Sequence, residues 1–234
     1  ITSFTYKLRP ELEPGDVGFD GLHVDTPAQV LSVEPLGLLN GEQVELAITR
    51  IDEEGFSVLI PRIDPSRTQE LLEISFQARI FEYNTPFTGR LFDSATPHEV
   101  PQIVLQGDAD ELTDGSTTRV ALTTIPHRSI RAMSLSSGVC TPNGDGVNDL
   151  VVLSYELVNV TGGVPAVVGI YDLAGRKLGD VVREPAAISG PVTTAWDGTD
   201  AQGRLLAPGI YVLQLTVEID TGEVRTQHLI SLAY

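Results

Sequence analysis

The sequence predicts an all-β protein built as two β-sandwich, immunoglobulin-like domains in tandem. Short apolar alternations separated by Gly, Pro, Asn and Asp recur from one end of the chain to the other, which is the pattern of strands joined by turns. Helical periodicity is scarce. The chain has 234 residues, of which 41% are hydrophobic, so it can supply a core for each of two ordinary domains.

The first domain, residues 1–130, contains runs with apolar or β-branched residues at alternate positions. Turn signals lie between them: the dipeptide Asn40-Gly41 joins two runs, and residues 52–55 form a short hairpin loop that ends in Gly55. Segment 65–72 predicts one helical turn capped by Ser66. The predicted strands are 3–8, 28–33, 43–51, 56–60, 71–83, 87–92, 102–105 and 119–124.

The second domain, residues 131–234, follows a stretch rich in Asp, Gly, Ser and Thr at 107–118, which predicts a long loop or a connector. Alternation returns over 127–137, so the boundary falls there. Two hairpins follow, at 172–176 and 220–223, each with Gly where a positive backbone angle is needed. Six or seven short strands in one domain predict an immunoglobulin-like sandwich. The predicted strands are 149–157, 166–172, 177–183, 192–196, 209–219 and 223–233.

The charge balance limits the class of partner. With 32 acidic against 15 basic residues the formal net charge is -17, which argues against nucleic acid and anionic membrane surfaces, where a basic patch is expected. An acidic surface suits solubility or the binding of divalent cations. The single cysteine, Cys140, cannot form an intrachain disulfide, and its position beside Val139 predicts a buried small side chain.

The sequence also bears on location. No run approaches the length of about 20 apolar residues that spans a bilayer, and no basic segment with an apolar core stands at the start. We therefore expect no membrane span. The chain begins at Ile1, which is compatible with a processed segment from which any signal peptide has been removed, and we expect an extracellular or cell-surface location.

Residues 141–149 concentrate oxygen-bearing side chains around two glycines. If Asp145 stands at position 5 of an EF-hand-like loop, Asn143 falls at position 3, Gly146 at the sharp turn, the Val147 carbonyl at position 7 and Asp149 at position 9. The bidentate glutamate of such a loop is missing. A calcium ion would therefore need ligands from elsewhere in the chain.

The best remote donors are Asp197 and Asp200, in a second acidic turn that a sandwich could bring to the same end; Asp172 is a weaker candidate. The predicted metal site is thus Asn143, Asp145, Val147, Asp149, Asp197 and Asp200, with calcium as the cofactor. The alternative is that the loop acids only bond backbone amides in Asx turns. The sequence leaves both open.

Several motifs of the second half occur in a recognisable order: 141–149 (TPNGDGVND), 170–176 (IYDLAGR), 196–200 (WDGTD), 203–204 (GR) and 208–211 (PGIY). In this order residues 138–234 resemble the FlgD-like Ig-like family, and they are also similar to the C-terminal sorting domains of proteins exported by the gliding-associated secretion route. The resemblance implies a secreted or surface β-sandwich without catalysis, with Trp196 in its core. Cys140 departs from the family, which often has an aromatic residue there. Residues 1–130 resemble no family.

These observations predict a non-enzymatic extracellular module of a bacterial surface or secreted protein, serving adhesion, assembly or a fibre. Its partners would be other protein subunits or cell-surface components. Strand addition through Ile1 to Leu8, which alternates cleanly, would give a homo-oligomer; the alternative is an ordinary first strand of its own domain.

A rival hypothesis is a carbohydrate-binding sandwich attached to a secreted enzyme. Its platform would be the aromatic side chains of the first half, namely Tyr6, Phe19, Phe81, Tyr83 and Phe87. Catalysis has little support. The four histidines, His23, His98, His127 and His228, are scattered, and no nucleophile elbow or phosphate loop is present.

Overall fold

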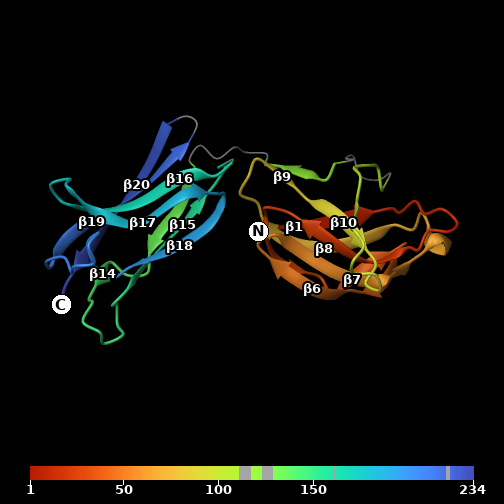
Figure 1. Cartoon of the computed structure of the whole chain (residues 1–234), viewed down its shortest axis with the longest axis horizontal. Coiled ribbons are helices and arrows are strands. Elements are labelled where there is room, and N and C mark those ends of the chain that lie inside the picture. Colours follow the sequence, from red (N-terminus) through yellow and green to blue (C-terminus); the bar gives the residue numbers. More distant parts are fainter. Residues whose placement is uncertain (111–116, 123–128, 161, 220–221) are drawn as a thin grey trace. The chain divides into compact units, whose positions relative to one another are not determined.

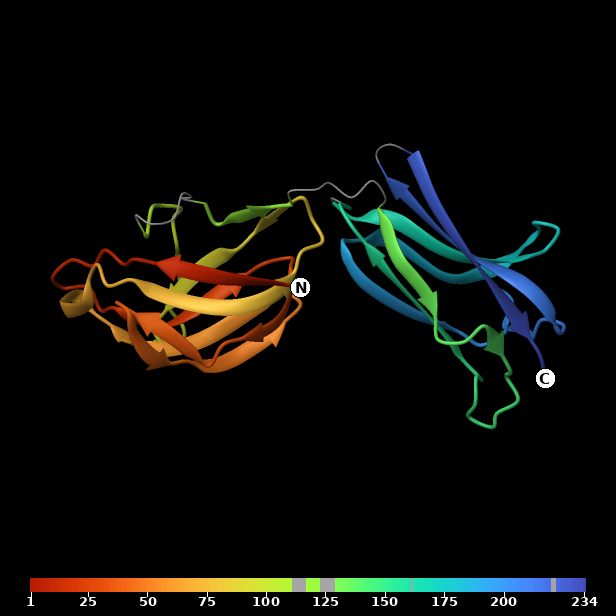
Figure 2. The same cartoon turned by 180° about the vertical axis from the view of Figure 1, so that it is seen from behind.

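A computed structural model describes residues 1–110, 117–122, 129–160, 162–219 and 222–234. The all-β prediction is confirmed: the described residues form strands β1 to β20 and one short 3-10 helix, Pro65–Arg67, with no α-helix among them (Figures 1 and 2). Nor does any helix in this part of the chain have the length and hydropathy for a bilayer crossing.

The chain divides into two compact units, Ile1–Thr124 and Ile125–Tyr234. The boundary predicted from the sequence, between residues 130 and 131, falls at the start of β13 (Ile130–Leu135). Ile130 is buried in the core of the second unit, so β13 belongs with that unit from its first residue. His127, named above, lies outside the described residues, as do Thr123, Thr124 and the tip of the hairpin at 220–221.

The first unit consists of two five-stranded antiparallel sheets and a two-stranded ribbon. One sheet has the order β1 (Thr2–Leu8), β8 (Leu72–Arg79), β4 (Leu36–Leu39) and β5 (Glu42–Glu45), with β3 (Gln29–Val33) also pairing with β8. The other has the order β11 (Gln102–Ile103), β10 (Thr88–Phe92), β2 (Phe19–Asp25), β7 (Gly55–Ile63) and β6 (Ala47–Asp52). The ribbon pairs β12 (Arg119–Ala121) with β9 (Asn84–Pro86).

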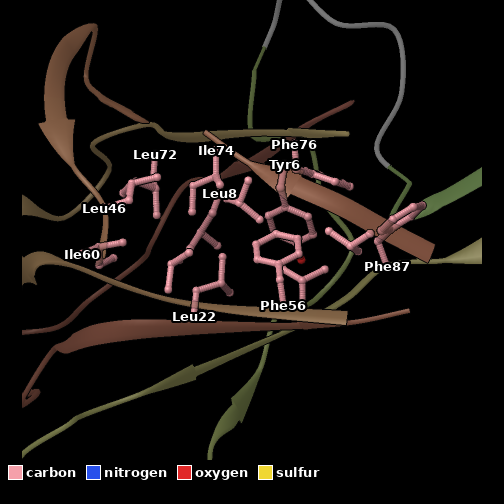
Figure 3. Packing of buried hydrophobic residues seen from close by; sticks show 14 of the residues in the cluster. Tyr6, Leu8, Leu22, Leu46, Phe56, Ile60, Leu72, Ile74, Phe76 and Phe87 are labelled. Carbon is pink, nitrogen blue, oxygen red and sulfur yellow. The ribbon is translucent and has the colours of Figure 1, made fainter. Parts of the chain in front are cut away.

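Alternate residues of the two sheets meet in one core. Tyr6 and Ile74 come from the first sheet, and Leu22 and Phe56 come from the second; all are buried in a single cluster (Figure 3). Burial of one large apolar side chain contributes about 1.5–3 kcal/mol. The period-2 pattern seen in the sequence therefore places one face of β8 and of the second half of β1 in the core.

The second unit has a three-stranded and a five-stranded sheet. The three-stranded sheet has the order β13, β15 (Val151–Leu157) and β18 (Gly190–Trp196). The five-stranded sheet has the order β14 (Val139–Cys140), β20 (Gly222–Leu232), β19 (Gly209–Ile219), β16 (Val164–Asp172) and β17 (Lys177–Ala187). All pairs are antiparallel except β14 with β20, which run parallel.

The core of the second unit contains the only tryptophan. Trp196 is 3% exposed, and its ring meets Tyr211 edge-on at a centroid distance of 6.4 Å. Cys140 is fully buried in the same cluster. Both predictions, a core tryptophan and a buried cysteine, are confirmed.

Two local predictions for the first unit are corrected. The helical turn exists, but its cap is Asp64, whose Oδ1 accepts a hydrogen bond from the Ser66 amide at 2.9 Å. The predicted strand 43–51 is two strands, β5 and β6, which belong to different sheets. Leu46, between them, is buried, and its amide donates to the Pro35 carbonyl, so the chain crosses from one sheet to the other at this residue.

Candidate functional site

The acidic loop 141–149 follows β14 and is closed by hydrogen bonds at its neck. The Thr141 amide donates to the Asn148 carbonyl at 2.8 Å, and the Thr141 hydroxyl donates to the Val147 carbonyl at 2.8 Å. The backbone has positive φ at Gly144 (80°), Gly146 (84°) and Asn148 (55°), which glycine and asparagine tolerate best. The residue types therefore specify this loop conformation.

Asp149 holds the centre of the loop. Its Oδ1 accepts the Gly144 amide at 2.8 Å and its Oδ2 accepts the Gly146 amide at 2.7 Å. These two backbone hydrogen bonds lower the pKa of the Asp149 carboxyl, because they favour its charged form. Both oxygens are thus engaged with the chain itself.

Two Asx turns complete the loop. Asn143 Oδ1 accepts the Asp145 amide at 3.0 Å, and Asp145 Oδ1 accepts the Val147 amide at 2.8 Å. Asn143 Nδ2 also donates to Asp145 Oδ2 at 3.2 Å. This is the arrangement that the turn-locking alternative predicts.

The second acidic turn does lie against this loop. A methyl group placed on Gly198 would lie 3.2 Å from Pro142 Cγ, 3.8 Å from Cys140 Sγ and 2.9 Å from Leu232 Cδ1. Burial raises the pKa of the Cys140 thiol, and the nearby charges of Asp197 and Asp149 raise it further. The expectation that the fold brings the two turns to one end is met.

The carboxylates of the second turn are nevertheless used locally. Asp197 Oδ1 accepts the Thr199 amide at 3.1 Å and the Thr199 hydroxyl at 2.6 Å. Asp200 Oδ1 accepts the Gln202 and Arg204 amides, and Asp200 Oδ2 binds the Arg204 guanidinium at 2.8 Å. These contacts lower the pKa of the Asp200 carboxyl, chiefly through the Arg204 amide.

The predicted metal ligands therefore share one end of the unit without converging on a point. Within the described ranges, no group of three or more His, Cys, Asp or Glu side chains has the arrangement of a metal site. The Val147 carbonyl, expected at position 7, accepts the Thr141 hydroxyl instead. Of the predicted set, Asn143, Asp145, Val147 and Asp197 are exposed, whereas Asp149 and Asp200 are half-buried.

A repeated turn was not anticipated from the sequence. Residues 172–176 (DLAGR) and 200–204 (DAQGR) form the same structure: the Asp amide donates to the Arg carbonyl, at 3.0 and 2.9 Å, and the Gly amide donates to the Asp carbonyl, at 3.0 Å in both. In each, Oδ1 of the aspartate accepts the Arg amide, and Oδ2 binds the Arg side chain. The shared pattern Asp-x-x-Gly-Arg was the available signal.

The aromatic platform predicted for carbohydrate binding is wrong for four of its five members. Tyr6, Phe19, Phe81 and Phe87 are buried, and only Tyr83, 48% exposed, reaches the surface. Three of these rings, Tyr6, Phe19 and Phe87, belong to the core of the first unit.

One serine and histidine pair in the first unit has hydrogen-bonding geometry. His23 Nδ1 lies 2.5 Å from Ser57 Oγ, burial lowers the pKa of His23, and the Phe92 ring stacks on the imidazole at 4.3 Å. Ser57 is 1% exposed. A substrate cannot reach this buried hydroxyl, so His23 and Ser57 do not form a nucleophilic site.

The N-terminal strand pairs with its own unit. β1 pairs with β8 along its whole length, from Thr2 with Ala78 to Leu8 with Leu72. Beyond its other edge, Lys7 forms an ion pair with Asp110, and Arg9 Nε donates to the Ala109 carbonyl at 2.9 Å. Donation of this strand to a neighbour would have to remove it from its own sheet.

Comparisons with known proteins add little to this site. No protein-family model matches the chain, and none of the curated proteins matches it in sequence. Among solved structures it is similar to dimeric latent PorU from Porphyromonas gingivalis, with 13% identity over 99% of this chain and 18% of that one, at a TM-score of 0.37.

Two further solved structures are similar at the same low level. A β-glucuronidase of Parabacteroides merdae shares 12% identity over 99% of this chain and 28% of that one, at a TM-score of 0.32. CopC from Methylosinus trichosporium OB3b shares 23% identity over 36% of this chain and 74% of that one, at a TM-score of 0.21. The chain spans less than a third of the PorU and β-glucuronidase chains. Likenesses at this level identify neither a family nor an activity.

Proposed function

We propose that this chain is a non-enzymatic extracellular module of a bacterial surface or secreted protein, with a structural or interaction role. The observation that carries the proposal is the use of the acidic side chains at the end of the second unit. Asp149, Asp172 and Asp200 each hold backbone amides of their own turns. Groups that could do chemistry or hold a metal are committed to fixing loops, as a scaffold requires.

We also propose that both units are immunoglobulin-like sandwiches. In the second unit a tyrosine at the start of β19 supports this: the Tyr211 hydroxyl donates to the Ala207 carbonyl at 2.6 Å. A tyrosine bonded to the backbone a few residues upstream is a corner typical of immunoglobulin-like domains. The motif order of residues 138–234, which resembles the FlgD-like family, points the same way.

The proposal is tested by the location of the natural protein that carries this chain. Antibodies raised against residues 1–234 would follow it in intact cells of its source bacterium. We expect protease added outside the cells to remove the antibody signal, while a cytoplasmic control protein survives. Retention of the signal until the cells are lysed would contradict the extracellular role.

A further inference from the structure

The outward face of the five-stranded sheet in the second unit contains a hollow of about 610 Å³. It is lined by β16, β17, β19 and β20, which are labelled in Figure 1. The inward residues of β19, among them Leu213 and Leu215, are buried in the core. The outward residues Gln214 and Thr216 therefore line the hollow.

Irregular pairing explains why this face is hollow. The register between β16 and β17 shifts three times, after Val164, Val168 and Ile170. Bulges of this kind bend a strand and increase its local twist. Because β17 is the edge strand of the sheet, its bending makes the outward face concave.

A glycine and a tyrosine form part of the floor. A methyl group placed on Gly169 would lie 2.8 Å from Tyr171 Cε2, 3.3 Å from Tyr171 Cζ and 3.2 Å from Lys177 Cε. The Tyr171 ring therefore lies across the glycine, in the space that a side chain would fill. The half-buried ring presents its other side to the hollow.

A chain of neutral hydrogen-bonding groups runs beside this ring. Gln227 Nε2 donates to Gln214 Oε1 at 2.6 Å, and Gln214 Nε2 donates to the Thr216 hydroxyl at 3.2 Å and to the Tyr171 hydroxyl at 3.5 Å. A side-chain amide has two donors and an oxygen with two lone pairs. These bonds take both donors of Gln214 but only one donor of Gln227, which is exposed and also lines the hollow.

The basic side chains of the hollow, Lys177, Arg183 and Arg225, are paired with carboxylates, and Glu218 adds a further carboxylate to its lining. Lys177 Nζ lies 2.5 Å from Asp180 Oδ1, and Arg183 Nη2 lies 2.8 Å from Asp180 Oδ2. Arg225 pairs with Glu223. An anionic ligand would have to displace Asp180 or Glu223 from these contacts, and the net charge of -17 opposes a polyanion. The face is suited to an uncharged, hydroxyl-rich ligand.

We propose that this hollow binds a neutral polysaccharide or oligosaccharide. The apolar face of a sugar ring would stack on Tyr171, and its hydroxyls would bond Gln214, Gln227 and Thr216, since an aromatic surface with a few placed polar groups is the usual make-up of a small-ligand site. The proposal rests on the extracellular role above, where such polymers occur. This surface differs from the set of aromatic side chains in the first unit that the sequence suggested for carbohydrate binding.

Affinity gel electrophoresis of the whole chain tests this proposal. The gels would contain hydroxyethylcellulose, glucomannan, mixed-linkage β-glucan, galactan or dextran as neutral probes, and alginate or polygalacturonate as anionic ones. We expect at least one neutral polymer to retard the protein. Tyr171→Ala should weaken that binding about tenfold or more, as loss of an aromatic anchor does, and Gln214→Ala should weaken it less.

Two further variants make the result specific. Gly169→Ala removes no binding group but displaces the Tyr171 ring, so it should also weaken binding. Tyr83→Ala removes an exposed tyrosine of the first unit and should leave binding unchanged. Trp196 fluorescence checks that the variants of the second unit are folded, and circular dichroism checks Tyr83→Ala in the first unit.

The proposal is overturned if no neutral polymer retards the chain, if only the anionic ones do, or if Tyr171→Ala binds as well as the original chain. Each of these results would leave the protease test of extracellular location standing, so the two proposals fail separately.

Discussion

At the scale of single residues, Asp149 makes the stability of the second unit depend on pH. Its pKa is lowered in the folded chain by the Gly144 and Gly146 amides, and the pKa values of Asp172 and Asp200 are lowered too. A carboxyl with a lowered pKa contributes stability that is complete above its unfolded value, about 3.9, and is lost as the pH falls through the folded value.

We therefore expect the melting temperature, followed by Trp196 fluorescence, to be steady between about pH 7 and 5 and to fall below about pH 4. Asp149→Asn should lower the melting temperature at pH 7, because one amide loses its acceptor. It should also make the fall in acid shallower, because the variant has no carboxyl to protonate at this position. Asp145→Asn is the matched control, since an asparagine Oδ1 can still accept the Val147 amide and only the 3.2 Å bond from the exposed Asn143 Nδ2 is lost. Equal effects of the two variants would show that Asp149 has no special role.

The prediction of a calcium site can be tested through residues of this same loop. Asp149 already bonds two amides, and Asp200 already binds Arg204, so a calcium ion that used them would have to replace those partners. Six to eight oxygens would be needed. We expect the same melting temperature in chelator and in millimolar calcium. A rise with calcium that Asp145→Asn abolishes would instead establish the metal site.

At the scale of elements, the glycine turns differ in what surrounds them. Gly175 (φ 82°) and Gly203 (φ 71°) are open to solvent at the Cβ position, whereas a methyl on Gly198 (φ 81°) would lie 2.9 Å from Leu232 Cδ1. Left-handed backbone costs an alanine about 1–2 kcal/mol. Gly175→Ala and Gly203→Ala should each reduce the free energy of unfolding by about that amount.

Gly198→Ala should reduce the free energy of unfolding more than either of these, because it adds a displaced core side chain to the same backbone strain. Urea unfolding of the three variants measures the difference. Gly175→Asn should recover part of the loss, since asparagine tolerates this backbone region. A Gly198→Ala variant as stable as Gly175→Ala would mean that the contact with Leu232 relaxes at no cost.

Strands with plain alternation could be predicted from the sequence, whereas a strand whose alternation is interrupted could be missed. The run predicted as 209–219 is β19 to the residue, because every second side chain is apolar. In contrast β2 was missed, although Leu22 and Val24 are fully buried. Gly21 interrupts its pattern, and a methyl there would lie 2.1 Å from Phe92 Cζ, so the glycine makes room for a ring from another strand.

The candidate site, too, could be predicted from the sequence only in part. The sequence correctly placed loop 141–149 and turn 196–200 together, because both adjoin the strands of one unit. It could not show which partner each carboxylate takes, since Arg204 and the Gly146 amide compete with any metal only once the turn has formed. Nor could it reveal the hollow over Gly169, which depends on the register shifts between β16 and β17.

At the scale of the whole molecule, each unit has its own core. The first core contains Phe56 and the second contains Leu215, and both side chains are fully buried. The chain has a single tryptophan, Trp196, which lies in the second unit. Its fluorescence therefore reports on the second unit, whereas circular dichroism reports on the strands of both.

We expect the two cores to respond separately to substitution. Phe56→Ala should destabilise the first unit by about 3–5 kcal/mol and shift the circular dichroism transition in urea while leaving the Trp196 transition in place. Leu215→Ala should cost about 2–5 kcal/mol and shift the Trp196 transition. If Phe56→Ala moves the fluorescence midpoint as much as Leu215→Ala does, the chain unfolds as one cooperative whole, because a lesion confined to one core would then be felt in the other.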